Sequence, residues 1–418
     1  MLKRVLHTAN QVVTHEETHT GTRELTIENT VNDSVDMLTV TGDSWQLVQE
    51  EIKDEEGNVT QPAMPSTEYP SEIVSVNGEM ASCGWNLLDC SKIVNLGTSN
   101  NSPTEYTFQN GVCIGRKSDG TFNQMILYFP NIYLEAGKTY VFLYSKAYYT
   151  VKSTGNKYKN GTTAGDVNME LSLNGKMVFR EYARTEKSFT PSITGKYVFA
   201  MVAFFNILSL TEFEVYNLTV KEITNKSKPY DHYRGNSIIL PTLRSLPDGT
   251  KDVLYVDRKN QRAWVERKIG ETVLDGSERT WKIYYENEGK HVYEVEINNA
   301  LRNWGSLNVY CSHFKSEFGR NMYVGDYTGS ACSILQNTRC LFGSTDRTGI
   351  FESIDTFKAF LSEHPVTVQY RLIDPIIEEL PYSDYLLETA QYQTNIRMTG
   401  LNENLQPEIT AQCKILGR

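Results

Sequence analysis

Short runs of alternating apolar and polar residues recur along the whole chain. Residues 25–28 and 37–40 alternate in this way near the start, and similar runs follow at intervals through the rest of the sequence. A period of two places one set of side chains on the buried face of a strand. The pattern therefore predicts strands in most of the chain, with the clearest runs at residues 124–129, 139–144, 168–173, 176–180, 195–205 and 212–220.

Two turns in this pattern can be assigned from residue type. Asn174 and Gly175 separate two runs by two residues, which is the spacing and composition of a tight β-hairpin. The tripeptide Pro-Asp-Gly at 247–249 is a second turn, because Pro fixes φ and Gly supplies a positive φ. After it, residues 253–256 and 263–267 are expected to pair as a hairpin across a polar break.

One segment has helical spacing. Phe357 and Leu361 fall on one face of a helix over residues 354–363, and Ser353 stands before it as a candidate N-cap. His364-Pro365 ends the pattern. The sequence therefore predicts one short helix near the C-terminal part of an otherwise β-rich chain.

These elements predict an all-β protein of several β-rich modules, because 418 residues is long for one domain. Prolines and polar stretches suggest where the modules divide. The expected segments are an N-terminal assembly or attachment section (1–78), a jelly-roll sandwich (79–224), a connector and hairpin (225–276), a second β-rich domain (277–373) and a C-terminal tail (374–418).

The composition and the missing motifs argue against several classes of function. The 25 Tyr and 28 Gly favour sandwiches with many turns. The formal net charge of −10 argues against electrostatic binding of nucleic acid or of an anionic membrane surface. The sequence has no Walker loop, dinucleotide fingerprint or Gly-x-Ser-x-Gly motif, so we expect no cofactor and no enzyme of those classes.

The cysteines and the N-terminus indicate where the protein is made. None of the seven cysteines form a Cys-x-x-Cys pair, and we expect reduced thiols from a bacterial cytoplasm. Two spacings permit a disulfide, Cys83 with Cys90 and Cys332 with Cys340. The first residues are basic without a following apolar stretch, so we expect no secretory signal.

Four colinear pieces of sequence carry a family resemblance. The run Leu-Pro-Thr-Leu-Arg-Ser-Leu-Pro-Asp-Gly-Thr-Lys-Asp at 240–252 resembles a module of tail-associated minor structural proteins of phages and prophages of Gram-positive bacteria. Residues 27–29 and 41–46, continued by 65–78, fit the same family, as do Cys-Gly-Trp-Asn-Leu-Leu-Asp at 83–89 and residues 357–381. At Trp85 the chain departs from the Lys usual in that family.

The resemblance implies a virion protein of the tail or baseplate periphery. It implies other tail proteins as partners and a homo-oligomer, with a trimer favoured. The layout of residues 79–224 is similar to sandwich-type carbohydrate-binding modules that recur in this family, which implies a contribution to attachment through a host-surface glycan.

The best candidate contacts for such a glycan lie in a Tyr-rich stretch. Tyr148, Tyr149 and Tyr158 are expected in a loop together with Asn156 and Lys157. Aromatic rings stack on sugar faces, and the neighbouring polar groups can bond to hydroxyls. In contrast, the aromatic residues of the preceding strand, Tyr140 and Phe142, are expected to be core.

One short motif points to a metal. Residues 15–19 read His-Glu-x-x-His, the zinc-protease pattern, which requires both His on one helix face. The threonines around it are poor helix formers, so we read the match as coincidence. If the stretch is a strand, His15, Glu17 and His19 share a face, and three copies around an axis could hold a metal.

Two further functions stay open. In one, every module serves assembly and none contacts the host. In the other, the protein degrades wall or capsule glycan, which would need two carboxylates converging across a cleft. Adjacent acids such as Glu378-Glu379 point to opposite faces of a strand and are expected to be surface charge.

Overall fold

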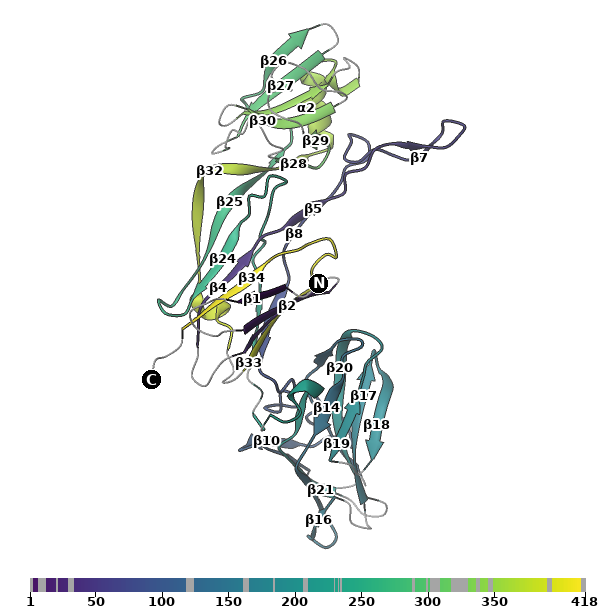
Figure 1. Cartoon of the computed structure of the whole chain (residues 1–418). Helices are drawn as coiled ribbons and strands as arrows, with labels where there is room; N and C mark the ends of the chain where they lie inside the picture. Colours follow the sequence, from purple (N-terminus) through teal and green to yellow (C-terminus); the bar gives the residue numbers. More distant parts are fainter. Residues whose placement is uncertain are drawn as a thin grey trace.

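The computed structural model describes residues 3–6, 13–19, 22–28, 34–117, 124–160, 165–182, 185–205, 210–228, 230–231, 233, 235–287, 290–297, 300, 309–316, 330–335, 339–344, 349–388 and 393–414. These residues form three bodies arranged along one axis. Figure 1 shows a central body that lies between a sandwich and a smaller distal domain.

Strands dominate the described chain, so the predicted all-β class is confirmed. The jelly-roll topology expected for residues 79–224 is not confirmed. In the residues that the structure describes, helical structure consists of α2 (Ile354–Glu363) and α3 (Tyr382–Tyr385), with short 3-10 turns η1 (Ile223–Asn225) and η2 (Gly349–Phe351). Among the described residues, no helix has the length and apolar character needed to cross a membrane.

Two six-stranded sheets build the central body. In sheet order, the first contains β1 (Lys3–Leu6), β2 (Val13–His19), β3 (Thr22–Glu28), β33 (Gln393–Thr399), β9 (Glu79–Cys83) and β23 (Ser237–Ile239). The second contains β28 (Val309–Cys311), β32 (Val366–Leu380), β25 (Arg262–Leu274), β24 (Val253–Asp257), β4 (Ser34–Thr41) and β34 (Ile409–Lys414). Buried side chains of both sheets, such as Ile27 and Leu254, form one core.

The central body combines segments that are far apart in the sequence. Strand β3 pairs with β33, so that Leu25 lies opposite Ile396, and β4 lies between β24 and β34. Segments 1–78, 225–276 and 374–418 therefore share sheets. The chain leaves this body twice and returns, first between β9 and β23 to form the sandwich, and then between β25 and β32 to form the distal domain.

The sandwich consists of three antiparallel sheets. The first sheet contains, in order, β10 (Glu105–Gln109), β11 (Val112–Arg116), β21 (Leu210–Tyr216), β15 (Lys146–Val151) and β16 (Lys157–Lys159). The second contains β12 (Gln124–Tyr128), β20 (Gly195–Phe205), β17 (Gly165–Leu173) and β18 (Lys176–Tyr182), with β13 (Ile132–Leu134) beside β20. The third contains β19 (Glu186–Phe189), β14 (Tyr140–Leu143) and β22 (Thr219–Glu222). Tyr140 and Phe142 lie in the core, as predicted. Asn174 and Gly175 join β17 to β18 with φ of 51° and 74°, which confirms the predicted hairpin turn.

The distal domain packs α2 against a sheet of β26 (Lys282–Asn287), β27 (Lys290–Glu296), β31 (Arg339–Ser344), β30 (Ser330–Leu335) and β29 (Lys315–Ser316). The predicted helix and its cap are confirmed, because Ser353 Oγ accepts the Thr356 N–H at 3.1 Å. Phe357 is fully buried, and its ring lies 5.0 Å from that of Phe351 and 5.5 Å from that of Trp281. This aromatic cluster fixes the helix on the sheet.

Two long strands connect the distal domain to the central body. Strand β25 begins with Ala263 and Val265 in the central core and ends with Leu274 in the distal core. Its partner β32 runs antiparallel to it over the same distance, with an irregularity where Arg267 pairs with Ile376 but Ile269 pairs with Arg371. The two bodies therefore share a continuous β-ribbon.

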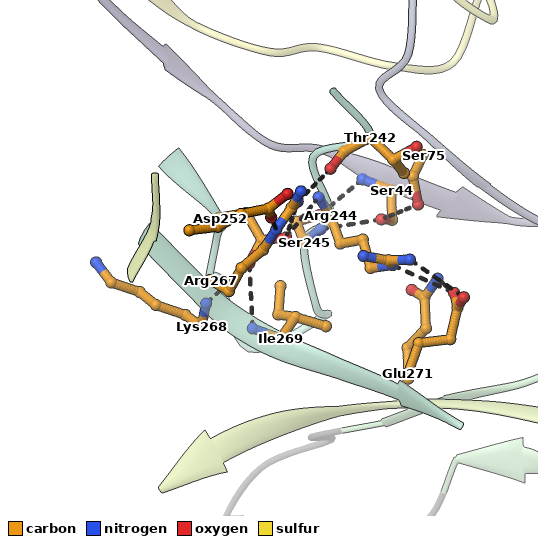
Figure 2. A network of polar contacts seen from close by, with 12 residues as sticks. Ser44, Ser75, Thr242, Arg244, Ser245, Asp252, Arg267, Lys268, Ile269 and Glu271 are labelled. Carbon is orange, nitrogen blue, oxygen red and sulfur yellow. Dashed lines mark hydrogen bonds and ion pairs between the residues drawn. The ribbon is translucent and has the colours of Figure 1, made fainter. Parts of the chain in front are cut away.

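A buried carboxylate supports this irregularity (Figure 2). Asp252 is fully buried, and its Oδ1 accepts the backbone N–H groups of Lys268 at 2.8 Å and Ile269 at 3.1 Å. Its Oδ2 accepts the backbone N–H of Arg244 at 3.2 Å and lies 3.3 Å from Arg267 Nη1. Burial raises the pKa of Asp252 above its ordinary value, although these donors act to lower it.

Two of the four sequence pieces on which the resemblance was based, residues 41–46 and 240–252, meet beside this carboxylate. Ser245 and Ser44 exchange two backbone-to-hydroxyl hydrogen bonds of 2.8 and 2.9 Å, and Ser245 Oγ donates to Asp43 at 3.0 Å. A Cβ on Gly42 would lie 2.2 Å from the Arg244 carbonyl oxygen, so only glycine fits there. Residues 41–46 and 240–252 are thus one structural unit, held together by buried polar contacts.

Six of the seven cysteines are reduced thiols: Cys83, Cys90, Cys113, Cys311, Cys332 and Cys340. Cys332 and Cys340 lie with their Sγ atoms 3.6 Å apart in the distal core and are not bonded as a disulfide. Burial raises the pKa of the Cys332 thiol well above its ordinary value, which makes it a poor nucleophile.

Candidate functional site

The candidate site is the outer face of the five-stranded sheet of the sandwich, in the order β10-β11-β21-β15-β16. Side chains alternate over residues 212–216 of β21, where Phe213 and Val215 pack in the core while Glu212, Glu214 and Tyr216 lie on the other face, with Glu214 only 6% exposed. The pairing register places Tyr148 opposite Glu214. One face of this sheet is therefore polar and aromatic across neighbouring strands.

Two tyrosines form the aromatic part of this face. The rings of Tyr148 and Tyr216 meet edge to face, with centroids 5.8 Å apart and an interplanar angle of 77°. Lys146 Nζ lies 4.4 Å from the centroid of Tyr216, and Lys157 Nζ lies 5.1 Å from that of Tyr148. The half-exposed rings thus stand among cations that hold them in place.

A carboxylate lies between these rings. Glu214 accepts a hydrogen bond from Tyr216 at 2.7 Å and forms an ion pair with Lys157. Burial acts to raise the pKa of Glu214, but the bonds from Lys157 and Tyr216 outweigh it and leave that pKa below its ordinary value. The hydrogen bond to Glu214 raises the pKa of Tyr216 to about 12, so at neutral pH the Tyr216 phenol is a donor and the Glu214 carboxylate is ionised.

A shallow hollow continues the face toward β11. It has a volume of about 290 Å³ and is lined by Arg116, Thr150 and Glu212 among others. Arg116 Nε donates to Glu212 at 2.7 Å. Together with Glu214, these groups give a flat surface with carboxylates, hydroxyls and cations beside tyrosine rings, a combination suited to hydroxyl-rich ligands.

The predicted glycan contacts divide between this face and the core. Tyr148 and Lys157 belong to the face. Tyr149 is only 1% exposed and packs in the core, where its ring stacks on Tyr158 at 5.9 Å. The expectation of a loop was wrong here, because strands β15 and β16 alternate and turn Tyr149 inward. Asn156 is exposed in the turn between these strands.

Glu212, Glu214, Tyr216 and Arg116 were not predicted as site residues. The signal for three of them was present in the sequence, since Glu-Phe-Glu-Val-Tyr at 212–216 alternates polar and apolar residues with a period of two. The sequence does not show which strands lie beside β21. The pairing of β21 with both β11 and β15 brings Arg116 and Tyr148 to the same face.

The zinc-protease interpretation of residues 15–19 is excluded by the backbone. These residues lie in strand β2, and the pattern requires a helix. The side chains of His15, Glu17 and His19 lie outside the described residues, so the threefold metal site stays a hypothesis. Within the described part of the chain, no cluster of three or more His, Cys, Asp or Glu could hold a metal.

A larger hollow lies where the sandwich meets the central body. Its volume is about 530 Å³, and its lining comes from β9 and β33 on one side and from the loop before β13 on the other. Arg397 lies 4.3 Å from the Tyr133 ring centroid and donates to Glu135 at 2.6 Å. These contacts across the junction position the sandwich on the central body.

Comparison of the chain with protein-family models and with curated proteins returns no match.

Proposed function

We propose that this chain is a structural component of a phage tail or baseplate, and that its sandwich contributes to attachment by binding a host-surface glycan. The observation that carries the binding half is the outer face formed by Tyr148, Glu214, Tyr216 and Lys157. It presents the half-exposed rings of Tyr148 and Tyr216 and the half-exposed Lys157, all held by the buried, ionised carboxylate of Glu214, and sugars are recognised by stacking on rings and by hydroxyl bonds to neighbouring polar groups.

The arrangement of the chain supports the structural half. Residues 41–46 and 240–252, two of the pieces that resemble tail proteins, lie in the central body, where Asp252, Ser245 and Ser44 join distant segments through buried bonds (Figure 2). That body carries the sandwich at one end and the distal domain at the other (Figure 1). A scaffold that displays two inserted domains suits a particle component that must both assemble and present a surface.

A purely architectural role is the second candidate, and one observation favours it. Lys157, Glu214 and Tyr216 already satisfy one another, so the face is complete without a ligand. A depolymerase would use a general acid with a raised pKa, whereas the pKa of Glu214 is lowered.

The binding half is tested by retention of the full-length protein on purified cell walls of Gram-positive bacteria and on a glycan array. We expect retention by the wild type and roughly tenfold or greater loss for Tyr148→Ala combined with Tyr216→Ala, because about 1.4 kcal/mol of stacking accounts for that factor. Lys176→Ala, on the far hairpin of the sandwich, is the matched control. Equal retention of all three proteins would favour the architectural role, and release of reducing sugar would favour the depolymerase.

The structural half is tested separately by mass spectrometry of particles released from an induced culture of the source bacterium. We expect the chain in purified tails at a fixed stoichiometry, encoded between a tape-measure gene and a holin or lysin gene. Its absence from purified particles would contradict tail membership whatever the glycan result.

A further inference from the structure

A two-stranded arm projects from the central body between β5 (Ser44–Gln46) and β8 (Ile73–Ser75). Its strands are β6 (Ile52–Lys53) and β7 (Val59–Gln61), which pair only with each other in the described chain. Gln49 and Met64 exchange backbone bonds of 2.7 and 2.8 Å at its base. Figure 1 shows the arm reaching well beyond the sheets, on the side away from β25 and β32.

The arm leaves several aliphatic side chains exposed to solvent. Val48 is 63% exposed, and Ile52 and Val59 are each 49% exposed. A two-stranded ribbon has no core of its own and is only marginally stable in water. Exposed aliphatic residues on such an element indicate a surface that is buried against a partner.

The charge of the arm restricts the kind of partner. Residues 47–61 contain five acidic residues and a single lysine: Glu50, Glu51, Asp54, Glu55 and Glu56, with Lys53. Lys53 lies 3.0 Å from Glu51, which leaves the tip of the arm acidic. The partner surface should therefore be apolar with a basic rim.

A groove of this kind exists on the central body, at the irregularity between β25 and β32. It has a volume of about 390 Å³, and its charged lining residues are Lys251, Lys268 and Arg371. Ile373 lines it with 37% exposure, and Ile376, next along β32, is 53% exposed. Cations and exposed aliphatic residues thus occur together, as the arm requires.

The three cations can accept further carboxylates. Lys251 lies 3.8 Å from Glu408 and Arg371 lies 4.0 Å from Asp248, which are long separations for ion pairs. Lys268 lies closer to its neighbour Glu266, at 3.1 Å. All three side chains keep between 31% and 41% of their surface exposed.

We propose that the acidic arm of one copy binds in the basic groove of a second copy. Because arm and groove are different surfaces, two copies either exchange arms around a two-fold axis or leave one arm and one groove open, to which further copies bind in a ring or a filament. The aliphatic residues supply the buried area, and the charges set the orientation. The proposal does not depend on tail membership or on glycan binding.

Sedimentation velocity of the full-length protein over a range of concentrations tests it by charge reversal. The arm variant is Glu55→Lys with Glu56→Lys, and the groove variant is Lys251→Glu with Lys268→Glu. We expect each variant alone to self-associate roughly tenfold more weakly or worse. An equimolar mixture of the two should recover association, because the reversed arm then matches the reversed groove.

Lys152→Glu with Lys159→Glu on the sandwich makes the same change in charge away from the groove and should leave association unchanged. Near-ultraviolet circular dichroism identifies any variant that has lost its fold, and the mixing experiment uses only folded variants. A wild type that sediments at its chain mass of 47.6 kDa at every concentration would overturn the proposal. So would a mixture without recovery, or a control variant that weakens association as much as the groove variant does.

Discussion

Asp252 and Glu214 are two buried carboxylates whose pKa values shift in opposite directions. For Asp252 burial dominates, and the pKa is raised despite three backbone donors. For Glu214 the bonds from Lys157 and Tyr216 dominate, and the pKa is lowered. Asp252 joins distant segments of the chain, and the buried, ionised Glu214 holds Lys157 and Tyr216 in place on the outer face of the sandwich.

Replacing Asp252 with Asn should destabilise the central body by about 2–4 kcal/mol, since removing one member of a buried polar network leaves its donors unpaired. An amide offers a single acceptor oxygen and directs its NH₂ group at one of the backbone N–H groups. Urea denaturation measures the change. Asp275→Asn, in an exposed turn where the oxygen bonded to Ser277 N–H is kept, should leave the midpoint unchanged.

The titration of Glu214, followed by NMR, should have a midpoint below its ordinary value of 4.5. Its folded-state pKa is depressed, so its contribution to stability is complete above the unfolded pKa and is lost as pH falls through the folded pKa. Lys157→Gln removes a donor and should move the midpoint upward, whereas Lys176→Gln should not. A midpoint that is the same in all three proteins would contradict the ion pair.

At the scale of single elements, local chemistry determines the helix and the turns. Helix α2 begins where Ser353 caps it, and its stability depends on this cap as well as on the buried ring of Phe357. The hairpin after Asn174-Gly175 needs positive φ at both positions, which these residue types provide at low cost.

Ser353→Ala should destabilise the distal domain by about 1 kcal/mol, because the Thr356 N–H loses its acceptor. Ser353→Asp should retain most of the stability, since Asp caps helices as well as Ser does. Thermal unfolding monitored by the fluorescence of Trp281 in the distal core measures both. Equal losses for Ala and Asp would contradict the cap.

These elements could be predicted because each is specified by its own few residues. The strand pairing could not be predicted, since β3 and β33 lie at opposite ends of the chain and neither sequence indicates the other as its partner. The misplacement of Tyr149 has a related cause. The stretch around it is rich in polar residues, and only the pairing of β15 with β21 and β16 shows which of two adjacent tyrosines turns inward.

At the scale of the whole molecule, three bodies are connected in two different ways. The distal domain continues the β25–β32 ribbon, whereas the sandwich is joined by two chain crossings and by side-chain contacts. Among those contacts, Arg397 from β33 reaches Glu135 and the Tyr133 ring of the sandwich. These contacts contribute to the orientation of the sandwich on the central body.

Arg397→Ala should loosen the sandwich relative to the central body without unfolding either, because both cores are separate from this contact. Small-angle X-ray scattering should then show a broader distribution of maximum dimensions. The control is Lys196→Ala, which removes an exposed and longer contact across the same junction, 3.8 Å from Glu79. Identical scattering from the wild type and Arg397→Ala would show that other contacts fix the orientation.

The return of the chain to the central body also sets the order in which the protein can fold during synthesis. The sandwich is one continuous stretch, so it can close as soon as it leaves the ribosome. The central sheets cannot, since β4 and β34 meet through Thr39 and Thr410, 371 residues apart. At roughly 5–20 residues per second, β4 waits for tens of seconds beside finished insert domains. During that interval the backbone N–H and C=O groups on the β34 side of β4 are unpaired, and a nascent chain interrupted before β33 would carry two folded domains on an open scaffold.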